Sequence, residues 1–163
     1  MTPARDVLTG AVTVRRATPN DVAGIATLVA SWAEESILLP RTTADVARAV
    51  DDTIVAVDAR GRVVACAALR EYAPSLAELV SVAVARDAHG RGLGRLVVAE
   101  VERLAVARGH ERLFAHTVNA PFFEAIGYDV VERSRYPEKV GRSHTACVER
   151  NLVGEPAVLA AAA

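Results

Sequence analysis

Aromatic side chains are scarce in this sequence: Phe, Trp and Tyr together supply 4% of its 163 residues, and there is one tryptophan. The core must therefore be built from the aliphatic residues that bring the hydrophobic content to 52%. With 24% charged residues, the composition is typical of a soluble globular protein and excludes a disordered one. A chain of this length is expected to form one domain and to bury about two thirds of its unfolded surface without a disulfide or metal.

An excess of charge of one sign is also lacking. Lys and Arg number 19 against 20 Asp and Glu, which gives a net charge of −1. Because a general nucleic-acid-binding protein shows a basic excess, we expect no nucleic-acid partner. The four histidines lack the close spacing of metal ligands, so no metal site is predicted.

Cysteine and long apolar runs are equally sparse. Cys66 and Cys147 lie far apart within apolar segments, which favours reduced core residues over a disulfide. No apolar run reaches the roughly 18 residues of a membrane span. Residues 1–10 lack the apolar segment of a signal peptide. We therefore expect a cytoplasmic protein with no membrane partner.

Hydrophobic periodicity predicts a mixed α/β domain over residues 12–152, between a flexible segment at 1–11 and a disordered tail at 153–163. The alternating or continuous apolar runs of the predicted strands span residues 12–16, 53–57, 62–69, 76–84, 112–117, 128–132 and 144–152. Helical spacing covers residues 19–33, 43–50, 93–108 and 120–126.

A glycine-rich turn is the most informative segment. The apolar strand 76–84 leads into His89-Gly90-Arg91-Gly92-Leu93-Gly94, which opens the long helix. Backbone N–H groups at a helix start bind phosphate oxygens, and glycine permits their close approach. Arg91 and Arg95 add charge there. An ordinary strand-to-helix connection remains the alternative. The position in mid-chain disfavours a dinucleotide fold, and the lack of Gly-Lys-Ser/Thr excludes a P-loop.

This turn resembles the acyl-CoA-binding motif of the GNAT family of N-acetyltransferases, whose form is Gln/Arg-x-x-Gly-x-Gly/Ala. A second block, strand 113–117 followed by Phe122-Phe123 and Gly127-Tyr128, is similar to the family's next motif. The resemblance implies a mostly antiparallel sheet of six to seven strands flanked by about four helices. It also implies a bulged central strand that splays from its neighbour to form a V-shaped cleft.

By this resemblance the cosubstrate is acetyl-CoA. Backbone groups of Val82, Ala83 and Val84 would hold its pantetheine arm, and Phe123 would form an apolar wall beside the arm. The amides that would hold the pyrophosphate belong to His89, Gly90, Arg91, Gly92, Leu93 and Gly94. His89 stands where the family has Gln or Arg.

Five segments also resemble the acetyltransferase domains of N-acetylglutamate synthases: residues 38–42, 77–84, 112–117, 122–123 and 136–140. The resemblance implies a short, stand-alone form that acetylates the α-amine of an amino acid, with L-glutamate preferred, in arginine biosynthesis. Many such domains follow an amino-acid-kinase domain, for which this sequence has no room. The partner would be this small molecule, and a homodimer stays open.

The same resemblance assigns catalytic roles. Glu78 matches the general base that takes the amine proton. Phe123 stands where many members use a tyrosine as the acid. In the glutamate-acetylating relatives a hydroxyl at the end of the preceding strand has this role, and the resemblance assigns it to Thr117. Ser81 is placed near Glu78 only if the strand is bulged, because residues three apart otherwise face opposite sides.

The two carboxylates of glutamate require cationic groups. Arg41 is the main candidate, because guanidinium binds carboxylate in a bidentate manner. Lys139, Arg142 and His144 lie where relatives complete the substrate pocket. Two alternatives remain: acetylation of another small amine or a peptide N-terminus, and a non-catalytic acyl-CoA-binding regulatory module. The missing tyrosine at position 123 supports the second alternative.

Overall fold

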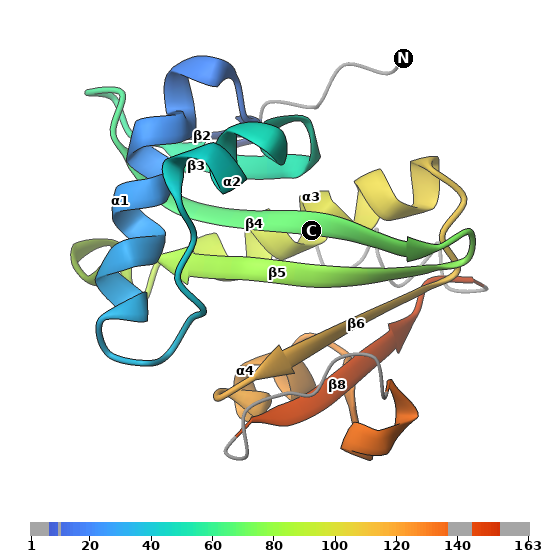
Figure 1. The fold of residues 1–163 in the computed structure, drawn as a ribbon. Helices are drawn as coiled ribbons and strands as arrows, with labels where there is room; N and C mark the ends of the chain where they lie inside the picture. Colours follow the sequence, from blue (N-terminus) through green and yellow to red (C-terminus); the bar gives the residue numbers. More distant parts are fainter. Residues whose placement is uncertain (1–6, 10, 137–144, 154–163) are drawn as a thin grey trace.

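A computed structural model describes residues 7–9, 11–136 and 145–153, and these residues form a single twisted sheet with helices on both faces (Figure 1). The order of the strands in the sheet is β1-β2-β3-β4-β5-β6-β8-β7. Every pair of neighbouring strands is antiparallel except β5 and β6, which are parallel. The strands are β1 (Val7–Thr9), β2 (Val12–Arg16), β3 (Thr53–Val57), β4 (Val63–Ala73), β5 (Leu76–Val84), β6 (Arg112–Thr117), β7 (Asp129–Val131) and β8 (Ala146–Asn151).

The mixed, mostly antiparallel class is therefore confirmed, but eight strands are described rather than the predicted six or seven. The additional strand is β1, which lies in the segment predicted to be flexible. It pairs with β2 from Val7↔Val14 to Thr9↔Val12, so its backbone groups are satisfied by the sheet edge.

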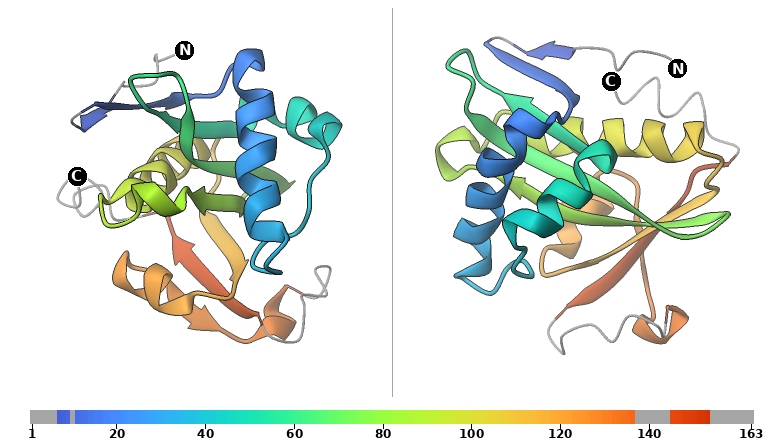
Figure 2. Two further views of the ribbon diagram at one scale, coloured as in Figure 1. Left: turned by 90° about the vertical axis from the view of Figure 1, so that its left-hand side faces the viewer. Right: turned by 45° about the horizontal axis from the view of Figure 1, so that its top comes forward.

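Four α-helices are described: α1 (Val22–Ala33), α2 (Thr43–Arg48), α3 (Leu93–Ala107) and α4 (Ala120–Ala125). Helices α1 and α3 cover opposite faces of the sheet (Figure 2). Helix α1 buries Ile25, Leu28 and Val29 at helical spacing against the side chains of β3 and β4. Helix α3 buries Val97, Val98 and Val101 on the other face, and Phe123 of α4 joins that core.

The sheet opens between β5 and β6. These parallel strands pair only over Leu76↔Arg112, Ala77↔Leu113 and Glu78↔Phe114. Beyond Glu78 the two strands part, and Figure 1 shows β6 diverging downward from β5. The predicted splay at the central strands is present.

A β-bulge lies in the part of β5 that has left β6. Cys66 pairs with Ala83 and Ala68 with Val80, so β5 has one more residue than β4 across this interval. Ser81 takes a φ of 56°, which is unusual for a residue with a side chain. The thiol of Cys66 donates a hydrogen bond to the Ser81 carbonyl, with Sγ and O 3.2 Å apart. The bulge increases the local twist and so favours the separation from β6.

Both cysteines are buried and free, as the sequence predicts. Burial raises the pKa of the Cys66 thiol to about 12 and that of Cys147 to about 11. The two thiols are therefore protonated at neutral pH and have little nucleophilic character.

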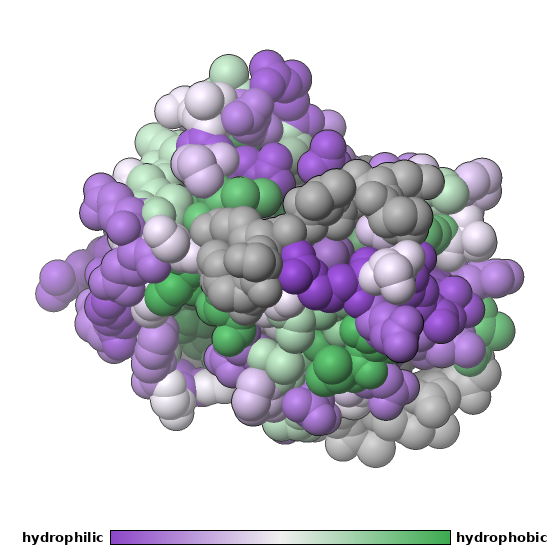
Figure 3. Space-filling view, turned by 60° about the horizontal axis from the view of Figure 1, so that its bottom comes forward, coloured by the Kyte–Doolittle hydropathy of each residue, from purple (hydrophilic) through white to green (hydrophobic). Residues whose placement is uncertain are grey.

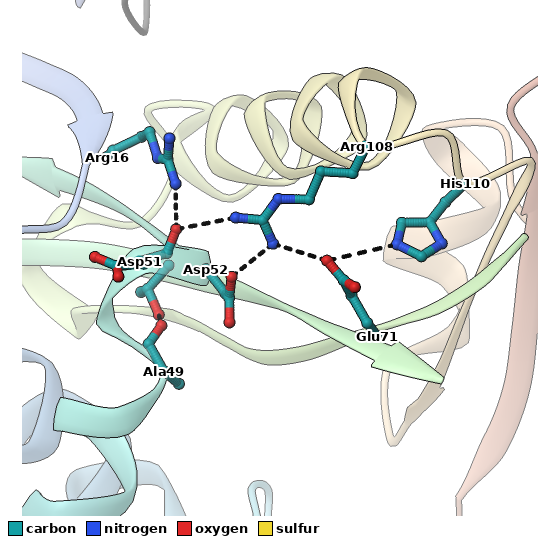
Figure 4. A network of polar contacts seen from close by, with 8 residues as sticks. Arg16, Ala49, Asp51, Asp52, Glu71, Arg108 and His110 are labelled. Carbon is teal, nitrogen blue, oxygen red and sulfur yellow. Dashed lines mark hydrogen bonds and ion pairs between the residues drawn. The ribbon is translucent and has the colours of Figure 1, made fainter. Parts of the chain in front are cut away.

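The C-terminal end of α3 is fixed by polar contacts (Figure 4). Arg108 Nη1 lies 2.6 Å from Asp52 Oδ1 and 3.1 Å from Glu71 Oε1, which links the helix to the segment before β3 and to β4. His110 Nε2 lies 3.7 Å from Glu71 Oε1. This network leaves the opposite, N-terminal end of α3 at the opening of the sheet.

A buried ion pair fixes β8, which lies beyond the opening of the sheet beside β6, to α3. Arg150 of β8 places Nη1 3.3 Å from Glu102 Oε2 of α3 and donates a hydrogen bond of 2.8 Å to the Ile126 carbonyl after α4. Burial raises the pKa of Glu102 to about 7, although Arg150 acts in the opposite direction.

We predict that this carboxyl makes stability depend on pH. Because its pKa is higher in the folded chain, its contribution is complete below about pH 4.5 and is lost as the pH rises through 7. The free energy of unfolding should fall by on the order of 3 kcal/mol across this interval. Urea unfolding of Glu102→Gln should give a flatter pH profile. Parallel profiles for the two proteins would contradict the assignment.

Candidate active site

A cleft of about 580 Å³ occupies the opening between β5 and β6. Its walls come from both strands, the end of α1, the segment before α2, the glycine turn and α4. Ile37, Leu39 and Val118 line it while remaining at least 37% exposed. Figure 3 turns the bottom of the Figure 1 view toward the reader, and on this face apolar patches lie among polar ones. The cleft therefore suits a ligand with both polar and apolar parts.

The glycine turn forms one end of the cleft. Gly90 and Gly92 have φ values of 78° and 73°, and Gly92 is the N-cap of α3 with no side-chain cap among the described residues. A Cβ built on either glycine meets no atom within 4 Å, so the surface of the turn is open. The bond across the cap runs from Leu96 N–H to Gly92 O, which leaves the amides of the first helical turn without an intrahelical partner. The His89 amide, which was predicted to hold the pyrophosphate, instead donates to Arg86 O at 3.4 Å.

Gly94 has a different role, because a Cβ there would lie 3.3 Å from the Phe122 ring and 3.4 Å from Val84. It permits close packing of α3 against β5 and α4. Of the six predicted turn residues, all but Arg91 line the cleft, and Arg95 lines it as well. Arg91 is exposed outside the lining.

The unpaired edge of β5 forms the floor, where Val82, Ala83 and Val84 all line the cleft. Ala85 N–H donates to Val64 O at 2.8 Å, so the polar groups of Val84 point to the opposite edge. The Val84 carbonyl there already accepts hydrogen bonds from Trp32 Nε1 at 3.1 Å and His89 Nε2 at 3.0 Å. The prediction that Val84 offers its backbone groups to a ligand is thus limited to its N–H.

The predicted catalytic residues all border the cleft. Glu78 is 1% exposed at the point where β5 and β6 part, Ser81 lies on the bulge, and Thr117 ends β6; all three line the cleft. Thr117 Oγ1 accepts a hydrogen bond from Asn119 N–H at 2.9 Å, which leaves its own proton available to donate. Thr117 therefore caps the turn before α4 without losing its capacity as a donor.

Arg41 and Phe123 also reach this cleft, as predicted. Phe123 is buried and packs edge-to-face against Phe122 and Tyr128, so it provides an apolar wall. Lys139, Arg142 and His144 lie outside the described residues. Thr145, which follows them, lines the cleft.

The sequence reasoning missed Trp32 as a site residue. Its spacing from Ile25, Leu28 and Val29 is that of a core position on α1, yet its side chain lines the cleft. Only its place in the last turn of the helix, where a side chain reaches the edge of the sheet, distinguishes it from a core residue.

Within the described ranges, no group of three His, Cys, Asp or Glu side chains is placed to hold a metal ion. None of the described helices is long and apolar enough to cross a membrane.

An open helix N-terminus beside an unpaired strand edge can bind a ligand that carries phosphate at one end and offers hydrogen-bonding groups along its length. The family model for the acetyltransferase (GNAT) family matches residues 20–128. This chain belongs to the GNAT family, whose members transfer an acetyl group from acetyl-CoA, the cosubstrate, to an amine.

Two curated proteins illustrate the relationship. An uncharacterized N-acetyltransferase of Chlorobaculum tepidum is 33% identical over 146 residues, which cover 90% of this chain and 94% of that protein. An amino-acid acetyltransferase of Pasteurella multocida is 28% identical over 129 residues, which cover 78% of this chain but 29% of that protein.

Two solved structures share the fold. N-acetylglutamate synthase from Neisseria gonorrhoeae, complexed with coenzyme A and N-acetyl-glutamate, matches with a TM-score of 0.79 and 24% identity, over 90% of this chain and 36% of that one. Rv2747 from Mycobacterium tuberculosis, in complex with CoA and NLQ, gives a TM-score of 0.74 and 26% identity, over 85% and 98% of the two chains.

The open turn generates a prediction. Gly92→Ala should raise the Kd of CoA ten-fold or more, because a side chain at this positive φ is strained and displaces amides whose bonds to a charged group are each worth about 1.5–3 kcal/mol. Gly61→Ala is the matched control, with a φ of 82°, an equally open surface and a place in the turn between β3 and β4. Calorimetric titration with CoA compares the two. Equal affinities would remove the turn from the binding site.

Proposed function

We propose that this protein transfers the acetyl group of acetyl-CoA to the α-amine of an amino acid, with L-glutamate preferred. The observation that carries the proposal is the convergence of Arg41, Glu78 and Thr117 on one cleft whose other end is the glycine turn. Glu78 and Val84 are separated by six residues of strand, roughly 20 Å, so the phosphates and the reacting thioester have separate places.

The comparisons support the amino-acid acceptor. The Neisseria protein was solved with N-acetyl-glutamate, and the Pasteurella protein is an amino-acid acetyltransferase. This chain spans 36% and 29% of those proteins, so their whole activities come to it as proposals. The product then enters arginine biosynthesis, and the protein acts in the cytoplasm.

The proposed reaction is a direct transfer. The ammonium group gives one proton to the Glu78 carboxylate, directly or through a water, and the resulting neutral nitrogen attacks the thioester carbonyl carbon. A C–N bond forms, the C–S bond breaks, and the Thr117 hydroxyl donates its proton to the leaving thiolate. The second nitrogen proton passes through solvent to restore Thr117, and solvent takes the proton of Glu78. Acetyl-CoA supplies the acyl group and the thiol leaving group.

An acyl-enzyme has no support among the described cysteines. Cys66 and Cys147 are both 0% exposed, and neither lines the cleft. Their raised pKa values keep both thiols protonated at neutral pH.

Recognition of glutamate depends on cationic groups at the acceptor end. Arg41, which lines the cleft, is proposed to bind one carboxylate in a bidentate manner. Lys139, Arg142 and His144 are proposed to complete the pocket, and Ser81 to contribute a hydroxyl from the bulge.

A second acceptor class is favoured by the apolar side chains beside Arg41. Ile37 and Leu39 are 37% and 48% exposed on the same segment. They suit a small amine or a peptide N-terminus with an apolar side chain in place of the second carboxylate.

We predict that Glu78→Gln lowers kcat at neutral pH by about 100-fold or more, the usual contribution of a general base. The Kd of acetyl-CoA should stay within two-fold of the wild-type value, about 0.4 kcal/mol, because Glu78 lies six residues along the strand from Val84 at the turn end. Release of free thiol measures the rate, and calorimetry measures the affinity. Unchanged turnover would show that Glu78 is not the base.

We predict that Arg41→Ala raises the KM for glutamate ten-fold or more, since a hydrogen bond to a charged group is worth about 1.5–3 kcal/mol. Arg60→Ala, in the exposed turn between β3 and β4, is the control and should leave this KM unchanged. Steady-state assays with varied glutamate provide the comparison. An unaltered KM in Arg41→Ala would exclude this residue from the acceptor site.

A further inference from the structure

Trp32 and His89 meet on one backbone oxygen at the end of β5. Trp32 Nε1 donates to the Val84 carbonyl at 3.1 Å, and His89 Nε2 lies 3.0 Å from the same atom. The two rings are stacked, with centroids 5.7 Å apart and planes 3° from parallel. One residue belongs to α1 and the other begins the glycine turn, so a single carbonyl joins both elements to the strand.

A third residue, Arg86, joins this stack from a different element of the fold. The Arg86 guanidinium lies 4.1 Å from the centroid of the Trp32 ring and forms an ion pair with Glu35, just beyond α1. Arg86 belongs to the short 3-10 helix Arg86–Ala88 between β5 and the turn. A cation over an indole face is attracted by the ring. The orientation of Trp32 is therefore fixed by contacts from two directions.

The shared carbonyl also fixes the histidine. A carbonyl oxygen only accepts, so His89 Nε2 must carry a proton. This bond turns the His89 side chain back toward β5, although its amide belongs to the turn that opens α3. The contact therefore restrains the start of the turn from the strand side.

The turn needs such a restraint. Gly90 and Gly92 have positive φ values, and where a Cβ would stand neither has an atom within 4 Å, so no side chain packs on that side of the turn. Glycine has more conformational freedom to lose than any other residue. A turn that is disordered before binding reduces affinity by the fraction of molecules that are not in the competent form.

We propose that Trp32 and His89 are positioning residues for acetyl-CoA: together they brace the Val84 carbonyl and hold the glycine turn in its binding conformation. The proposal rests on the proposed function only in taking acetyl-CoA as the ligand of the cleft. The brace acts through the backbone of the turn, so its loss affects the affinity for CoA rather than the chemistry at Glu78.

The experiment uses the one tryptophan of the chain as its reporter. Because Trp32 lines the cleft and stacks on His89, CoA should change its fluorescence, and titration gives the Kd for the wild type and for His89→Ala and His89→Gln. We expect His89→Ala to raise the Kd about ten-fold, about 1.4 kcal/mol. His89→Gln should recover most of this loss, because its side-chain amide can also donate to the Val84 carbonyl.

Trp32→Phe keeps a ring but loses the N–H donor, and calorimetry measures its Kd. We expect it to weaken CoA binding, and the double variant with His89→Ala to lose less than the sum of the two single losses, because both act on one carbonyl. In steady-state assays the loss should fall on the KM for acetyl-CoA more than on kcat.

The outcomes separate the two claims. A wild-type protein that binds no CoA overturns the proposed function itself. If the wild type binds but His89→Ala has the same Kd, the brace is wrong. It is also wrong if His89→Gln loses as much as His89→Ala, or if the two single losses add fully. Thermal unfolding shows whether each variant is folded, and His89→Gln and Trp32→Phe test the brace even if His89→Ala does not fold.

Discussion

The separation of β5 from β6 is the constraint on which the rest of the structure depends. The β5 backbone pairs with β4 along nearly its whole length, but with β6 only as far as Glu78. Backbone groups left without a strand partner need another one. Trp32 and His89 supply partners for the Val84 carbonyl, and the cleft exposes the remaining edge to a ligand. The bulge at Ser81 favours this arrangement by twisting β5 just beyond its last pair with β6.

The cleft that this separation opens has two chemically different ends. One end has the open N-terminus of α3, which we propose binds phosphate. Glu78, buried where the strands part, lines the same cleft with Arg41 and Thr117, and we propose that these residues serve the acceptor. Helix α3 is held independently of the cleft by Arg108 at its C-terminus and by the buried pair of Glu102 with Arg150. The cleft is therefore built between elements that are fixed elsewhere.

Local patterns in the sequence predicted much of this arrangement. The glycine turn and the central strand follow from motifs whose backbone requirements are local, whereas Glu78, Thr117 and Arg41 were proposed from the resemblance to the family. Strand β1 and the extension of β4 to Ala73 were missed, because cross-strand pairing stabilises segments that lack a continuous apolar pattern. The bond of Trp32 to Val84 joins residues 52 positions apart, and local sequence patterns do not predict such a contact.

The most direct test of the central claim is release of free thiol when the purified protein is mixed with acetyl-CoA and each of the twenty amino acids in turn. The account predicts release with L-glutamate at a higher kcat/KM than with any other acceptor. Binding of CoA without thiol release for any of the amino acids would contradict it and favour a non-catalytic acyl-CoA-binding module.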